Sequence, residues 1–165
     1  MRVHDIDWRN RQPEDHAVIC FLLRGEEVLL INKKRGLGAG KVNGPGGKCE
    51  EGETGAEAAI RETEEEVGLR PLSVLERGRL LFQFADGYAL DVDLFLSTEF
   101  EGTLRETAEA KPFWAHRDAI PFDRMWADDI LWLPKLLAGR IVRGRFLFDD
   151  DKMTDYAVGF DVAPE

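Results

Sequence analysis

Three glutamates near the end of one short segment are the residues whose type and spacing best suit chemistry. At about 100° per residue of a helix, Glu62, Glu65 and Glu66 share one stripe, with Glu62 and Glu66 one turn apart. Like charges at this spacing repel each other, and carboxylates near a helix C-terminus face the negative end of its dipole. A compensating cation is therefore expected. Mg²⁺ suits such a site because it takes oxygen ligands and keeps positions open for water and phosphate.

The sequence marks both ends of the helix that would carry these glutamates. Thr54 followed by Glu57 fits a capping box, Gly68 suits the left-handed C′ position, and Pro71 prevents continuation. The pattern predicts a helix over residues 55–67 whose core-facing stripe comprises Ala56, Ala59, Ile60, Thr63 and Val67. A solvated acidic helix that binds no metal is the alternative interpretation.

Composition limits the class of protein. A chain of 165 residues with 44% hydrophobic residues suits a single domain over residues 1–165, with residues 1–15 as a polar N-terminal arm. A net charge of −10 argues against a nucleic acid polymer or an anionic membrane as the main partner. Cys20 and Cys49 suit neither a disulfide framework nor a zinc site. With no long apolar segment in the sequence, we expect a soluble, monomeric, cytoplasmic protein.

The remaining elements read as strands around two helices. Asp86-Gly87 is a strong hairpin signal, and a second helix is expected over residues 126–138, with Asp128 as a candidate N-cap and Pro134 kinking it or delaying its start. Strands are predicted over residues 16–23, 27–32, 72–85, 88–98, 111–116, 140–148 and 154–160. Residues 33–47 and 99–110 are expected to be irregular. This order predicts an α+β fold, a mixed β-sheet sandwiched between α-helices.

The glycine-rich segment before the first helix is a candidate phosphate site. It lacks the spacing of a dinucleotide-binding motif, and no Gly-Lys pair in it is followed by Ser or Thr, so Rossmann and P-loop interpretations are rejected. A basic strand end that begins at Lys33 precedes glycines that permit close backbone approach. Solvated lysines at a strand end are the alternative, but an acidic metal site next to this segment favours phosphate contact through Lys33.

The helix and its approach resemble the Nudix box, the signature of a hydrolase family. The matching positions are Gly47, Glu53, Arg61-Glu62, Glu65-Glu66 and Gly68-Leu69. Thr63 departs from the pattern, because family members usually carry a bulky aliphatic residue there. Three further segments, KKRGLGAGKVNGPGGK, RLLFQF and IPFDRMWADDILWLPKLL, resemble the MutT-homologue branch of the family, which hydrolyses 8-oxo-purine nucleoside triphosphates. The resemblance extends over residues 16–160, and it implies a Nudix fold.

The resemblance also implies roles for individual residues. The metal ligands would be the Gly46 carbonyl and the carboxylates of Glu62, Glu65, Glu66 and Glu109, with Mg²⁺ or alternatively Mn²⁺ as the ion. Glu53 and Arg61 join the carboxylates as catalytic residues, and Glu106 competes with Glu109 for its role. The base pocket would comprise Asn43, Phe82, Trp126, Asp128 and Asp129. Aromatic walls and an edge of amide and carboxyl groups independently suit a purine.

The implied reaction is the hydrolysis of oxidised purine nucleoside triphosphates such as 8-oxo-dGTP to the monophosphate and pyrophosphate, which sanitises the nucleotide pool. Leu37 and Val18 stand where animal members of that branch have an aromatic residue and a threonine. A preference for a different base is therefore an alternative. One alternative is a Nudix hydrolase of a dinucleoside polyphosphate or a nucleotide sugar. Another is an inactive nucleotide-binding module, which would have no need for three mutually repelling carboxylates.

Overall fold

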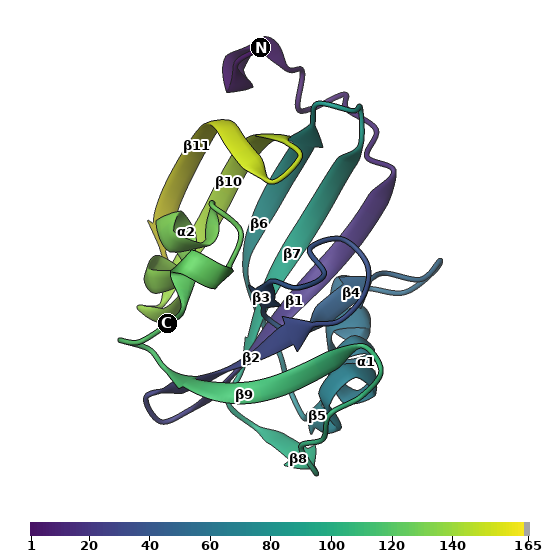
Figure 1. Cartoon of the computed structure of the whole chain (residues 1–165), viewed down its shortest axis with the longest axis vertical. Coiled ribbons are helices and arrows are strands. Elements are labelled where there is room, and N and C mark those ends of the chain that lie inside the picture. The colour runs from purple at the N-terminus through teal and green to yellow at the C-terminus, as the bar shows by residue number, and fades with distance from the viewer. Residues whose placement is uncertain (164–165) are drawn as a thin grey trace.

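A mixed β-sheet with a helix on each face forms the framework of the protein (Figure 1). The computed structural model describes residues 1–163. The strands are β1 Asp15–Arg24, β2 Glu27–Lys33, β3 Val42–Asn43, β4 Gly46–Lys48, β5 Leu69–Pro71, β6 Leu75–Phe84, β7 Ala89–Ser97, β8 Phe100–Gly102, β9 Ala110–His116, β10 Arg140–Asp149 and β11 Lys152–Val162. The helices are α1 Gly55–Val67 and α2 Asp129–Leu137, with short 3₁₀ turns η1 Val3–Asp5 and η2 Phe122–Arg124. The predicted α+β sandwich is confirmed.

The sheet divides into two parts at the β1–β2 hairpin. Its order is β11-β10-β6-β7-β1-β2-β3, with β4 also paired to β1 and β9 also paired to β2. Two pairs are parallel, β1 with β7 and β6 with β10. β1 and β2 pair only near their turn, at Leu23↔Val28 and Arg24↔Glu27. Beyond that point β1 and β2 diverge, and the space between the two parts of the sheet is available for a site.

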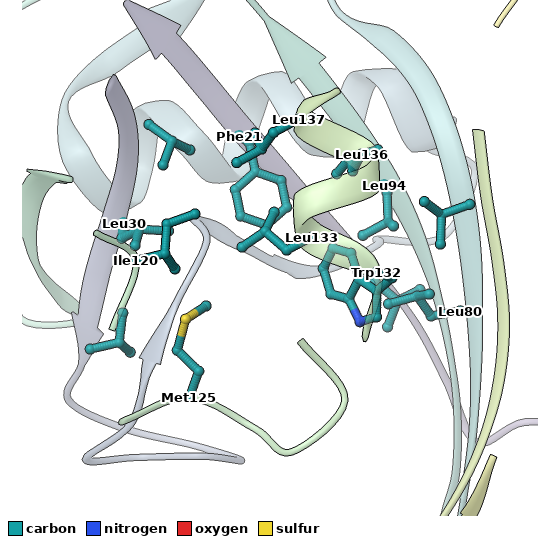
Figure 2. Packing of buried hydrophobic residues seen from close by; sticks show 14 of the residues in the cluster. Phe21, Leu30, Leu80, Leu94, Ile120, Met125, Trp132, Leu133, Leu136 and Leu137 are labelled. Atoms are coloured by element: carbon teal, nitrogen blue, oxygen red, sulfur yellow. The ribbon is translucent and has the colours of Figure 1, made fainter. Parts of the chain in front are cut away.

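Strand β1 separates the two hydrophobic clusters of the core. Its side chains alternate, so Cys20 joins the cluster beneath α1 while Phe21 joins the cluster beneath α2. Figure 2 shows Trp132, Leu133 and Leu136 of α2 close to Phe21. The two helices therefore pack on opposite faces of the sheet. Within residues 1–163, no helix has the length and apolar character needed to cross a membrane.

Helix α1 has the predicted ends. The Thr54 hydroxyl accepts the Glu57 amide at 3.1 Å, the Glu57 carboxylate accepts the Thr54 amide at 3.0 Å, and Gly68 has φ 83°. Thr63 is fully buried, and its hydroxyl donates to the Ala59 carbonyl at 2.7 Å. This bond satisfies the hydroxyl, which explains how a polar residue is accommodated at the position where the Nudix pattern expects an aliphatic one.

Helix α2 begins later than predicted, at Asp129 instead of residue 126. Asp128 occupies the N-cap position, but its side chain makes no capping bond. Its carboxylate instead accepts from the indole nitrogen of Trp132 at 2.8 Å. Asp128 is thus at the predicted N-cap position, but its carboxylate does not cap the helix and faces the interior because the buried indole needs an acceptor.

Two segments expected to be irregular contain short strands. Residues 33–47 include β3 and the start of β4, and residues 99–110 include β8, which pairs with β5. Residues 33–47 were expected to be irregular because of their glycines, and residues 99–110 because of their charged side chains. Gly46 lies opposite Ile19 in the β1–β4 pair, and a Cβ there would collide with the Val18 carbonyl. Glycine at this position permits a close strand pairing.

The N-terminal arm is fastened by a buried arginine. The Arg11 guanidinium donates to the Asp91 carboxylate at 2.8 Å and to the Phe82 carbonyl at 2.6 Å. Only 7% of the Arg11 side chain and 11% of the Asp91 side chain are exposed. Arg79 lies 3.4 Å from the other Asp91 oxygen, but half of its side chain is exposed. The arm is thus packed against β6 and β7 through charge pairing. Within the arm, the Trp8 indole donates to the Val3 carbonyl at 2.8 Å.

We expect Arg11→Ala to destabilise the fold by about 3 kcal/mol, because removal of one partner leaves a buried charge uncompensated. Urea unfolding of the variant and the wild type at pH 7 measures the difference. Arg79→Ala is the matched control, with an expected loss below about 1 kcal/mol since its ion pair is largely exposed. Equal losses for the two variants would contradict a special role for Arg11.

Candidate active site

One cavity brings the two predicted groups of site residues together. It has a volume of about 840 Å³ and lies among α1, β1, β2, β4, β6, β7 and the start of α2. From the predicted metal and phosphate group it is lined by Lys33, Gly46, Glu62, Glu65, Glu66 and Glu109. From the predicted base pocket it is lined by Asn43, Phe82, Trp126, Asp128 and Asp129. The volume is within the range of small-molecule sites.

Arg61 organises the glutamates of α1, although it does not line the cavity itself. Its guanidinium makes a bidentate pair with Glu53, with nitrogen–oxygen distances of 2.7 and 2.9 Å. The remaining terminal nitrogen lies 2.9 Å from Glu62 and 3.2 Å from Glu65. The hydrogen bonds from Arg61 to Glu53 lower the pKa of Glu53 to about 2. Arg61 therefore keeps Glu53 ionised and holds two neighbouring carboxylates at the cavity.

Glu66 is the buried member of the glutamate group. It is 8% exposed, whereas 60% of the Glu65 side chain is exposed. Burial raises the pKa of Glu66 to about 8, despite a 3.4 Å hydrogen bond donated by the Gly46 amide. Burial also raises the pKa of Glu62. Lys33 faces Glu66, and burial lowers the pKa of its ammonium. The protein itself thus supplies too little positive charge for Glu66.

The donor set fits a hard divalent cation. Carboxylate oxygens of Glu62, Glu65 and Glu66 line one cavity, and these are the ligands that Mg²⁺ prefers. A Cβ at Gly47 would collide with the Glu62 carboxylate, so glycine there leaves space for that side chain. Within residues 1–163, no three acidic, histidine or cysteine side chains already surround a common point. Arg61 holds Glu62 and Glu65 in this arrangement, so an ion would have to compete for them.

The base pocket contains polar atoms that have no protein partner. The Asn43 side-chain nitrogen and one Asp128 carboxyl oxygen are buried and form no hydrogen bond within the described residues. Asp129 is 7% exposed and directly follows Asp128. Burial raises the pKa of both carboxyl groups, and the charge of Asp128 raises that of Asp129 further. The pocket therefore offers a donor, an acceptor and a protonatable acid to a ligand.

Aromatic side chains form the walls of this pocket. The Trp126 indole packs edge-on against Phe84 and Phe148, with ring centroids 6.2 and 5.4 Å apart. Phe82 stacks on Phe146 at 5.2 Å. Trp126 is half-buried: it lines the cavity and also packs against the core cluster beneath α2. Such flat walls suit the faces of a purine.

The structure distinguishes Glu109 from its competitor. Glu109 lines the cavity, and its carboxylate lies 3.6 Å from Arg35. Glu106 instead pairs with Lys34 and does not line the cavity. The loop between β8 and β9 thus places Glu109 near the carboxylates of α1.

Several residues that line the cavity carry no clear signal in the sequence. Phe84 could have been found from Phe82, because residues two apart on a strand share a face. Tyr88 and Asp15 could not, because their 2.7 Å hydrogen bond joins strands that are parallel neighbours only in the folded chain. Leu37 and Val18, the two departures from the family branch, both line the cavity.

The sequence of the chain matches a known protein family. The sequence model of the NUDIX domain matches residues 13–136, well over half of the chain. The chain belongs to the Nudix family, whose members generally use divalent metal ions.

Relatives and solved structures agree with this assignment. An oxidized purine nucleoside triphosphate hydrolase of Danio rerio is 46% identical over 131 residues, which are 79% of this chain and 84% of that protein. The Mus musculus protein of the same name is 40% identical over 142 residues, covering 85% of this chain and 91% of that protein. The crystal structure of a mutator MutT protein from Bacillus halodurans matches with a TM-score of 0.77 and 28% identity, covering 87% of this chain and 97% of that one.

Glu66→Gln should stabilise the metal-free protein, and increasingly so as the pH rises. A carboxyl group whose pKa is raised by folding contributes stability at low pH that is lost between its unfolded value, about 4.3, and its folded value of about 8. Thermal or urea unfolding in EDTA should show little difference at pH 4.5 and a difference on the order of 5 kcal/mol at pH 8.5. Added Mg²⁺ should then stabilise the wild type more than the variant. A difference independent of pH would contradict the burial of an ionisable Glu66.

Proposed function

We propose that this Nudix hydrolase converts oxidised purine nucleoside triphosphates such as 8-oxo-dGTP to the monophosphate and pyrophosphate, and so sanitises the nucleotide pool. The observation that carries the proposal is the unpartnered polar edge of the pocket, the Asn43 nitrogen and the Asp128 oxygen beside buried Asp129. Buried polar atoms without partners are costly, so a ligand that pairs with all of them gains strongly. The relatives named as oxidized purine nucleoside triphosphate hydrolases support the same substrate class.

A guanine-like base matches this edge. A protonated Asp129 donates to a purine carbonyl, while ionised Asp128 accepts from ring and amino N–H groups. Burial, together with the charge of Asp128, raises the pKa of Asp129 well above that of an ordinary carboxyl and so favours its protonated form. Trp126 and Phe82 supply flat walls for the rings. The base is thereby oriented with its triphosphate toward α1.

The phosphate end is assigned to the residues around α1. Glu62, Glu65 and Glu66, with the Gly46 carbonyl and Glu109, would hold Mg²⁺, with Mn²⁺ as the alternative ion. Such ions, when bound, neutralise charge on the phosphates and lower the pKa of the attacking water. Lys33 contacts a phosphate, and its burial strengthens that interaction. Glu53 orients Arg61, and Arg61 in turn positions Glu62 and Glu65.

The same proposal covers the organisation of the protein. Residues 1–165 form one Nudix domain, since β10, which lies beyond the matched residues 13–136, pairs with β6 in the central sheet. The proposed protein is a monomer that acts on small nucleotides in the cytoplasm. Its net charge of −10 favours a monomer and disfavours binding to a nucleic acid polymer.

Turnover of the wild type across a nucleotide panel tests the function. With Mg²⁺ present, we expect 8-oxo-dGTP to give the highest kcat/KM, ahead of dGTP, a dinucleoside polyphosphate and a nucleotide sugar. Glu66→Gln should lose at least about a hundredfold in kcat, because removal of one charge-stabilising group typically costs that much. Glu64→Gln is the matched control on the same helix, since Glu64 is half-exposed and lies outside the cavity.

Three outcomes would contradict the proposal at different points. A higher kcat/KM for the dinucleoside polyphosphate or nucleotide sugar would support the other Nudix activity. Tight nucleotide binding without turnover would support the inactive binding module. Equal damage from Glu64→Gln and Glu66→Gln would show that the assignment of the metal-facing stripe is wrong.

Asp129→Ala and Asp128→Ala should each raise KM for 8-oxo-dGTP by a hundredfold or more, since removal of a partner from a polar site leaves buried groups unpaired. Steady-state kinetics with 8-oxo-dGTP and dGTP measures the effect, and Mg²⁺ affinity should be unchanged because neither residue belongs to the metal group. Asp123→Ala, an exposed acid of η2 outside the cavity, is the control. If both pocket variants kept the wild-type KM, the two aspartates would have a structural role only.

A further inference from the structure

Lys41 lies behind the Trp126 wall of the base pocket. Its ammonium nitrogen is 5.2 Å from the centroid of the Trp126 ring and 3.5 Å from the Asp151 carboxylate. Only 28% of the Lys41 side chain is exposed, whereas Asp151, in the turn between β10 and β11, is 64% exposed. Lys41 does not line the cavity. Any influence on a bound base must therefore pass through Trp126 or through its charge.

The glycine segment before Lys41 is folded into a tight loop against the same indole. Gly36, Gly38 and Gly40 have φ of 78°, 81° and 90°, a conformation that favours glycine. The loop is closed by hydrogen bonds from the Gly40 amide to the Lys33 carbonyl at 2.8 Å and from the Lys33 amide to the Lys41 carbonyl at 3.0 Å. A Cβ at Gly38 would lie 2.7 Å from the Trp126 indole nitrogen. Backbone and indole are thus in direct contact.

The other side of Trp126 rests on the sheet. Phe84 ends β6, and Phe148 lies near the end of β10, shortly before the turn that carries Asp151. The indole is therefore held between the glycine loop and the strand ends. The Lys41–Asp151 ion pair joins these two supports across it. An exposed ion pair alone would contribute little, but Lys41 is mostly buried and also contacts the ring.

We propose that Lys41, fastened to Asp151, is a positioning residue of the base pocket, which holds the Trp126 wall in place and sets the charge around Asp129 from outside the cavity. The proposal rests on the proposed function, in which Trp126 and Asp129 contact the base. It assigns to the glycine loop a role in base recognition, in addition to the phosphate role expected from Lys33.

Asp129 provides a readout that a purely structural role would not change. The charged groups that face it are Asp128, which raises its pKa, and Lys41, which lowers it. Loss of the Lys41 charge therefore leaves Asp129 protonated to a higher pH. Because the protonated acid is the form that donates to the base, the alkaline decline of kcat/KM should move to higher pH.

The test compares Lys41→Met, Lys41→Arg and Asp151→Asn by steady-state kinetics from pH 6 to 10. For Lys41→Met we expect KM about fivefold higher at pH 7, from the loss of the contact with Trp126, an unchanged kcat, and an alkaline limb displaced to higher pH. Lys41→Arg should restore the wild-type limb. Asp151→Asn should raise KM without moving the limb to higher pH. Lys152→Met removes an exposed lysine at the start of β11, next to Asp151, and should match the wild type.

The assay uses the panel nucleotide that the wild type hydrolyses best. If that nucleotide is not 8-oxo-dGTP, the proposed function fails while the Lys41 comparison still proceeds on it. If Lys41→Met matches Lys152→Met in KM and pH profile, the inference is overturned. It is also overturned if Lys41→Arg has as high a KM as Lys41→Met and the alkaline limb does not move. The effect would then come from the shape of the side chain and not from its charge. Should Lys41→Met fail to fold, as judged by its thermal melt, Lys41→Gln and Asp151→Asn replace it.

Discussion

The placement of acidic side chains where water barely reaches is the constraint on which this structure depends. Glu66 on α1 and Asp129 on α2 are both largely buried, and they approach one cavity from helices that pack on opposite faces of the sheet. Burial of a carboxylate without a counter-charge is costly. The divergence of β1 from β2 keeps the cavity open, so the missing cation and hydrogen-bond donors can come from ions and substrate. Folding thus leaves interactions that only a ligand completes.

Surroundings, and not residue type, decide what each acid does. Glu53 and Glu66 are both glutamates, yet Arg61 lowers the pKa of Glu53 to about 2 while burial raises that of Glu66 to about 8. The first is a fixed anion that holds an arginine. The second changes charge readily when a cation arrives. Glutamates in and just before α1 therefore provide both a support and a site.

Local signals were sufficient to predict α1, its caps and the β6–β7 and β10–β11 hairpins, because each depends on residues close in sequence. The parallel pairing of β1 with β7, the strand character of Gly46 and the Arg11–Asp91 pair depend on distant residues, so no local pattern indicated them. The site followed the same division. The glutamates of α1 were visible as a stripe, whereas the base pocket was found by resemblance, since its members come from separate elements.

The two departures from the family branch bear on how a base is selected. Leu37 stands at the cavity rim and is 45% exposed, so it offers less stacking surface than an aromatic residue would. Val18 is 1% exposed and lacks a hydroxyl, so its side chain cannot form a hydrogen bond with a nucleotide. What remains is the edge formed by Asn43, Asp128 and Asp129. Polar edges discriminate far more strongly than apolar walls. Under the proposed function, selectivity rests on the protonation and placement of that edge, and the supports behind Trp126 then matter as well as the residues that would touch the base.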